Sequence, residues 1–148
     1  GIDVFPKEPK NNKEPFESAL KGLPNTILTP HIGGSTLEAQ QNIARFVPGK
    51  IIEYINTGNT YNSVNFPNIQ LPFLHDAHRL IHIHLNEPGI MAKINNVLAD
   101  FEINIVGQYL KTNEKIGYVI TDIDKAYSSK VIDELKAIEG TIRFRVLY

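Results

Sequence analysis

Cysteine is absent from this sequence of 148 residues, which excludes disulfide bonds and thiolate metal sites. A chain without cysteine suits a reducing compartment, so we expect it in the cytoplasm. Acidic and basic side chains nearly balance, and a net charge of −1 creates no field that attracts nucleic acid or an acidic membrane surface. No apolar run reaches the length needed to cross a bilayer. We therefore expect neither nucleic acid nor a membrane as a partner.

The composition that remains is that of a globular protein, with 42% hydrophobic residues. A chain of this length has room for one ordinary domain or two small ones. It begins at Gly1, and its one methionine, Met91, lies far inside it. We therefore expect the sequence to be a piece of a longer protein.

The first half of the chain begins with a segment rich in turns, residues 1–25. Short apolar stretches at residues 2–5 and 26–30 predict two strands, and Pro30 ends the second.

A helix is predicted over residues 36–57, where apolar residues recur at helical spacing. Ser35 would be its N-cap, Glu38 would complete a capping box, and Gly58 would end it. Pro48 lies in its interior and costs about 3 kcal/mol there, so we expect a kink or two helices end to end.

Residues 59–77 are polar, contain two prolines and show no clean period, which predicts a linker or an extended edge segment, and a domain boundary. Beyond it the pattern alternates between strand and helix periods. The predicted elements are a strand at 78–85, a helix at 88–101, strands at 103–112 and 115–124, a helix at 128–140 and a strand at 141–148. This β-α-β-β-α-β order predicts a ferredoxin-like α+β domain.

Glu8 and His31 are the candidate catalytic residues of the first half. Each is framed by prolines, and a carboxylate beside an imidazole fixes its tautomer and favours its protonated form. That pairing suits a general acid/base. Spacing alone leaves open that Glu8 is a surface residue and His31 an ordinary loop residue.

A second candidate site lies where the helix of residues 88–101 begins. The free N–H groups of a helix N-terminus attract a carboxylate, Gly89 allows a ligand to approach the backbone, and His84 and Asn86 add polar contacts. The alternative is that His84 is an exposed strand residue and Asn86 a turn former.

The stretches "IDVFPKEP" and "NTILTPHIGGSTLEAQQNIA" resemble the C-terminal end of the catalytic region of D-2-hydroxyacid dehydrogenases. The resemblance runs from Ile2 to Tyr148 and includes the C-terminal ACT regulatory domain of this family. It implies that residues 1–58 are the tail of an α/β dehydrogenase core, 59–77 a linker and 78–148 an ACT domain.

The resemblance also implies roles for single residues. His31 would take the proton of the C2 hydroxyl of 3-phosphoglycerate while hydride passes to NAD, and Glu8 would tune its basicity. Asp3 would lie near the nicotinamide carboxamide, and Gly33 would allow close approach to the nicotinamide ring. The glycine-rich phosphate loop and the substrate-binding arginine have no counterpart here, so we expect this chain alone to be inactive.

In the ACT domain, the resemblance assigns His84 and Asn86 to binding of the effector L-serine. Asn104 would contact the same serine from a neighbouring subunit. The partners of the chain would then be other copies of itself, joined through their ACT domains into what is usually a tetramer.

Three features depart from the family pattern. Glu87 stands where relatives often have arginine, and an acidic group there could weaken binding of a carboxylate ligand. Asp76 and Ala77 replace a Gly-Gly hinge, and Pro48 interrupts a helix normally continuous.

The second half of the chain is open to other functions. Four histidines within ten residues suggest a metal site, but no third ligand for zinc accompanies His82 and His84 on their strand face. The β-α-β-β-α-β order also occurs in RNA-binding modules, yet the basic-aromatic signature of those modules is missing. An oligomerisation domain without a ligand stays open.

Overall fold

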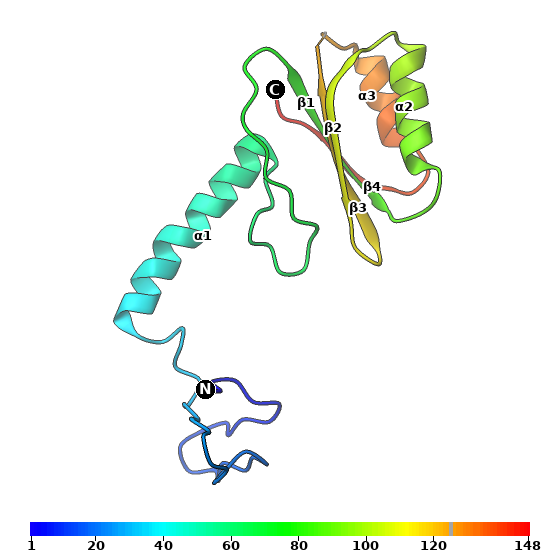
Figure 1. The fold of residues 1–148 in the computed structure, drawn as a ribbon. Coiled ribbons are helices and arrows are strands. Elements are labelled where there is room, and N and C mark those ends of the chain that lie inside the picture. The colour runs from blue at the N-terminus through cyan, green and yellow to red at the C-terminus, as the bar shows by residue number, and fades with distance from the viewer. Residues whose placement is uncertain (125) are drawn as a thin grey trace. The chain divides into compact units, whose positions relative to one another are not determined.

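The computed structural model describes residues 1–124 and 126–148 (Figure 1). The chain divides into two compact units, Gly1–Pro48 and Gly49–Tyr148.

The first unit is built almost entirely from turns. The two strands predicted at 2–5 and 26–30 reduce to one parallel bridge between Ile2 and Leu28. The bridge rests on two backbone hydrogen bonds, from Ile2 N to Ile27 O (2.9 Å) and from Thr29 N to Ile2 O (3.0 Å). In residues 1–48, all of which the structure describes, no side chain is buried. This unit therefore has no hydrophobic core of its own.

Helix α1 (Leu37–Thr57) begins in the first unit. Its N-cap is Thr36 and not Ser35, because the Ala39 N–H donates to Thr36 Oγ1 over 3.1 Å. The predicted capping box is therefore displaced by one residue. The alternative of two helices end to end was wrong, since one helix runs through Pro48. Gly58 follows the helix with φ 77°, a left-handed conformation that glycine adopts without strain.

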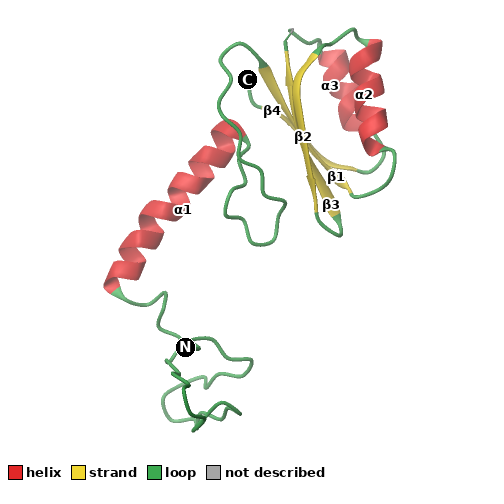
Figure 2. Ribbon diagram, in the orientation of Figure 1, coloured by secondary structure: helices red, strands yellow, loops and turns green. Residues whose placement is uncertain are grey.

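The second unit contains a four-stranded antiparallel sheet with the strand order β2-β3-β1-β4 (Figure 2). This order and the sequence of elements confirm the predicted ferredoxin-like α+β fold. The elements are β1 (His78–Leu85), α2 (Ile90–Asp100), β2 (Ile105–Thr112), β3 (Ile116–Ile123), α3 (Ser129–Ala137) and β4 (Thr141–Val146).

Helices α2 and α3 cover one face of the sheet (Figure 1). Apolar side chains recur on the inner stripe of each helix and meet alternate residues of β1 and β3. The core of this face is formed by Leu80, Ile90, Ile94, Leu98, Ile103, Val119, Ile123, Val131 and Leu135.

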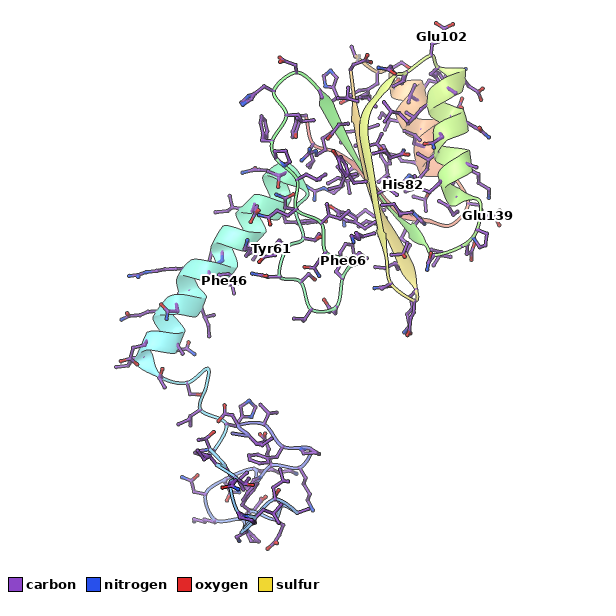
Figure 3. All side chains as sticks on the ribbon, in the orientation of Figure 1. Phe46, Tyr61, Phe66, His82, Glu102 and Glu139 are labelled. Carbon is purple, nitrogen blue, oxygen red and sulfur yellow. The ribbon has the colours of Figure 1, made fainter. Side chains whose placement is uncertain are left out.

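The opposite face of the sheet is covered by residues that the sequence predicted as a linker. Ile69 is buried with Ile81, Ile83, Tyr118 and Ile120, and Tyr54, Phe66 and Leu71 pack against them. The ring of Phe66, which is labelled in Figure 3, meets the ring of Tyr118 edge to face, with centroids 5.0 Å apart.

The segment that follows α1 is closed by hydrogen bonds from two buried residues. Asn59 pairs through its side-chain amide with the backbone of Leu71, giving and accepting bonds of 3.1 and 2.8 Å. The Thr60 hydroxyl donates to Pro67 O and accepts from Ile69 N. Polarity and proline content predicted a linker or an extended edge segment, because they do not show that the side chains of Asn59 and Thr60 bond to the backbone of residues 67–71.

Candidate functional site

The structure brings the two candidate catalytic residues into direct contact. Nδ1 of His31 lies 2.8 Å from Oε2 of Glu8, and the second carboxylate oxygen, Oε1, accepts from the Phe5 N–H over 2.9 Å. The side chain of His31 is 51% exposed and that of Glu8 33% exposed. The pair therefore combines a fixed ring orientation with an open approach to the imidazole.

A second carboxylate, Asp3, holds the backbone on which His31 stands. Its Oδ1 accepts from the Thr29 hydroxyl (2.6 Å) and from Ile32 N (3.0 Å), and its Oδ2 accepts from Gly33 N (2.9 Å). These bonds enclose His31, whose φ of 53° lies in the left-handed region that non-glycine residues rarely adopt. Asp3 thus stabilises the turn that presents the imidazole.

Gly33 is held close to the same carboxylate. A Cβ at position 33 would lie 2.9 Å from Asp3 Oδ2, so a side chain there would disturb the carboxylate that organises the turn. The structure therefore brings together Asp3 and Gly33, which were expected at the cofactor. Asp3 and Gly33 also stabilise the turn that carries His31, through the bond from Gly33 N to the Asp3 carboxylate.

The electrostatics of the pair favour proton transfer at His31. The hydrogen bond that Glu8 accepts from the ring, followed by the negative charge of Glu8, raises the pKa of His31 above the usual value of 6.5. The same contact, helped by the Phe5 N–H, lowers the pKa of Glu8. A histidine fixed at Nδ1 can accept or release a proton at Nε2, as a general acid/base does.

A cavity of about 520 Å³ adjoins the pair within the first unit. Phe5 and Phe16, whose rings meet edge to face at 4.7 Å, form part of its wall together with Lys21. The carboxylate and imidazole thus face a hollow with apolar and cationic groups.

The second candidate site lies at the end of β1 and the start of α2. His84 is 2% exposed, so the alternative of an exposed strand residue was wrong. Asn86 is exposed, and its side-chain amide donates to Asn113 O over 2.8 Å. Gly89 takes φ 90° at the N-cap of α2.

Asn104 lies at the opposite end of the sheet from Asn86. The Asn86 N–H bonds to Lys115 O just before β3, whereas Asn104 O accepts from Asp124 N just after it. At roughly 3.3 Å per residue, the eight residues of β3 separate the two positions by about 25 Å. One chain cannot bring both amides to one amino acid.

His82 is buried with His84 on the helix-covered face. Its Nε2 lies 2.7 Å from the Thr141 hydroxyl, and its ring packs against Phe144. Burial, assisted by the nearby His84, lowers the pKa of His82 to about 4. Among the described residues, no three side chains of the metal-ligating types lie together. Within residues 1–124 and 126–148, no helix has both the length and the apolar character needed to cross a membrane.

Sequence reasoning missed several residues that position these groups. Thr29 supports Asp3, and Asn113 supports Asn86. Thr29 stands two residues before His31, and this proximity is a usable signal. No signal in the sequence shows which turn contacts Asn86.

The fold defines the class of protein domain to which the second unit belongs. Residues 80–143 match the family model described as "AHAS small subunit-like ACT domain". The four-stranded sheet with its two helices therefore has the ACT-domain fold, which confirms the predicted fold class. Among solved structures, the crystal structure of the ACT domain from GTP pyrophosphokinase of Chlorobium tepidum is similar at a TM-score of 0.44. It has 18% identity and covers 48% of this chain and 96% of that chain.

Curated relatives match the chain over both units. D-3-phosphoglycerate dehydrogenase of Haemophilus influenzae is 51% identical over 147 residues, and that of Escherichia coli K12 is 50% identical over 149 residues. The enzyme of Dictyostelium discoideum is 45% identical over 147 residues. In each case 99% of this chain and 36% of the relative are covered. The chain therefore belongs to the D-3-phosphoglycerate dehydrogenase family and spans about a third of the length of these relatives.

Proposed function

We propose that Glu8 and His31 are the acid/base pair of an NAD-dependent dehydrogenase that oxidises 3-phosphoglycerate to 3-phosphohydroxypyruvate in serine biosynthesis. The observation that carries this proposal is the 2.8 Å contact between His31 Nδ1 and Glu8 Oε2. The names of the curated relatives supply the substrate. Residues 1–58 would then be the tail of the catalytic region, and the working enzyme would be cytoplasmic.

Oxidation of a hydroxyl group needs a base for the O–H proton and an acceptor for hydride. In the proposed reaction, His31 takes the proton at Nε2 while Glu8 stabilises the imidazolium that forms. NAD, when bound, supplies the hydride acceptor.

The residues present are compatible with a nicotinamide beside His31. A carboxylate offers about four acceptor positions, and Asp3 uses three of them on Thr29, Ile32 and Gly33. One position remains for a carboxamide N–H. Asp3 and Gly33 are therefore the residues we assign to the cofactor.

A chimera tests the catalytic proposal, because the chain spans only part of its relatives. In the enzyme of Haemophilus influenzae, this segment replaces the matching 36% of the chain. We expect 3-phosphoglycerate-dependent reduction of NAD. His31→Asn should lower kcat/KM ~10³-fold, in the range that general acid/base groups contribute, and Glu8→Gln, which acts through His31, should lower it less, ~10- to 100-fold.

Glu14→Gln is the matched control for Glu8→Gln. Its carboxylate lines the same cavity but bonds to Lys10 N and Asn11. It should leave kcat/KM unchanged. Full activity of the His31→Asn chimera would refute the proposal.

We further propose that the ACT domain binds L-serine between two copies of the chain. Support comes from the separation of Asn86 and Asn104, which only a second copy can bring together. Each serine would contact His84 and Asn86 of one copy and Asn104 of the other. Self-association of two copies through their ACT domains follows from this arrangement, and the tetramer that the family resemblance implies is part of the proposal.

Calorimetric titration of the chain with L-serine, with D-serine as the control, tests the effector proposal. Light scattering in the same buffer reports whether the chain is a dimer. Stereospecific binding near one serine per chain is expected, and it should be lost in Asn86→Ala and in Asn104→Ala. A dimer that binds no serine would instead support an oligomerisation domain without a ligand.

Glu87 is a further variable in effector binding, since it lies beside Asn86. Its Oε2 would lie 3.9 Å from a Cβ at Gly140, which places the carboxylate toward the turn between α3 and β4. Glu87→Gln should therefore change serine affinity less than Asn86→Ala does.

A further inference from the structure

The imidazole of His84 lies against a strand position that has no side chain. His84 on β1 is the cross-strand partner of Gly117 on β3. A Cβ at Gly117 would collide with Cε1 and Nε2 of the His84 ring, far inside ordinary contact distance. The ring therefore occupies the space that any other residue at position 117 would fill.

One ring nitrogen of His84 is held by the backbone. Its Nδ1 lies 2.5 Å from Leu85 O, and a carbonyl oxygen only accepts, so Nδ1 carries the proton and donates it. When the imidazole carries one proton, at Nδ1, Nε2 bears the acceptor lone pair. This nitrogen is buried and has no hydrogen-bond partner within the described part of the chain.

The unpaired Nε2 of His84 is a candidate acceptor for a ligand. Buried polar atoms normally have partners, so Nε2 is matched to a donor such as the ammonium or hydroxyl of a small molecule. Rotation of the ring would break the bond to Leu85 O and remove this acceptor. Both features require that position 117 stays without a side chain.

We infer that Gly117 is a positioning residue for the effector site. Because Gly117 has no side chain, it leaves the space in which the His84 ring lies with Nε2 as an acceptor. This inference rests on the proposed binding of L-serine at His84. It adds a residue that does not touch the ligand and acts through the histidine.

Nitrogen-15 NMR of the histidine side chains, combined with calorimetry, tests the inference in the whole chain. Wild type should show His84 protonated at Nδ1. Gly117→Ala should lose this tautomer signature and weaken L-serine binding at least tenfold. Gly107→Ala is the matched control: it is also a strand glycine, but the atoms nearest to its Cβ would all belong to the exposed side chain of Tyr109. It should keep the signature and the affinity.

Retention of both the tautomer and the serine affinity in Gly117→Ala would overturn the inference. If Gly117→Ala does not fold, the double variant with His84→Ala decides. Removal of the ring should restore the fold, and a double variant as unstable as the single one would overturn the inference.

The two proposals fail separately. Wild type that binds no L-serine refutes the proposed effector site. The NMR comparison of wild type with Gly117→Ala needs no ligand, so it still decides whether Gly117 holds the ring.

Discussion

The guanidinium of Arg79 on β1 and the carboxylate of Asp122 on β3 form a bidentate ion pair. Nε donates to Oδ1 over 2.7 Å and Nη2 to Oδ2 over 2.8 Å, and both side chains are 1% exposed. Arg79 also donates to Thr57 O and to Pro72 O, each at 3.0 Å. One buried arginine therefore joins the sheet to the end of α1 and to the segment after it.

Arg79→Met is expected to destabilise the chain by about 3–5 kcal/mol, because it leaves the Asp122 carboxylate buried without its partner. The double variant Arg79→Met, Asp122→Leu should cost less, since no unpaired charge remains. Urea unfolding of the three proteins measures both values. Equal loss in the single and the double variant would contradict this account.

Much of the ACT fold could be predicted from the sequence, because its periods are clean. Alternation in β1 and helical spacing in α2 located these elements within a few residues. The Arg79–Asp122 pair was also within reach, since the two charged residues stand in phase with Ile81 and Ile120 on apolar faces. The packing of residues 59–77 was not, because it depends on contacts with strands far along the chain.

Glu8→Gln is expected to lower the pKa of His31 toward its usual value of 6.5. The hydrogen bond and charge of Glu8 are the largest causes of the raised pKa, and glutamine removes the charge. NMR titration of the His31 ring measures the shift. In the chimera, kcat/KM for hydroxyl oxidation falls as pH drops through the His31 pKa, so this limb should move to lower pH in Glu8→Gln. If the acid side of the pH profile of kcat/KM is the same in Glu8→Gln as in wild type, Glu8 does not influence the proton transfer at His31.

The catalytic pair could be proposed from residues and resemblance, but its supports could not. Glu8 and His31 are 23 positions apart, and only the folded turn shows them in contact. The two bonds that Asp3 accepts from the N–H groups of Ile32 and Gly33 depend on the left-handed backbone at His31, which nothing in the sequence indicates. The geometry of the turn therefore determines whether Glu8 and His31 meet, which the sequence alone leaves open.

His82 is expected to make the chain lose stability on acidification. Its pKa is about 4 in the folded chain, whereas an unperturbed histidine has a pKa of 6.5, so the unfolded chain binds more protons between these pH values. The free energy of unfolding should fall from pH 6.5 to pH 4, by at most roughly 3 kcal/mol from this group.

Denaturant unfolding of wild type and His82→Gln between pH 7 and pH 4 measures this contribution. The variant should show a shallower loss of stability. His75→Gln, at an exposed position, is the matched control and should keep the wild-type slope. Parallel slopes in wild type and His82→Gln would assign the acid sensitivity to other groups.

Truncation at two positions shows how far the ACT domain extends toward the N-terminus. Residues 49–148 keep every contact of the second unit and should unfold at nearly the same temperature as the whole chain. Residues 78–148 lose Phe66, Ile69 and Leu71, which cover one face of the sheet. Full burial of a large apolar side chain contributes about 1.5–3 kcal/mol, and Ile69 is buried while Phe66 and Leu71 are partly buried, so their loss removes a large share of the stability of a small domain.

The shorter piece also leaves buried polar groups without partners. Arg79 loses Thr57 O and Pro72 O, and the Tyr118 hydroxyl loses Gly58 O, to which it donates over 2.6 Å. Residues 78–148 should therefore be partly unfolded at room temperature, with poor dispersion of amide signals in NMR spectra. If they melt at the same temperature as residues 49–148, residues 59–77 are a linker, as their composition predicted. A lower melting temperature makes them part of the domain.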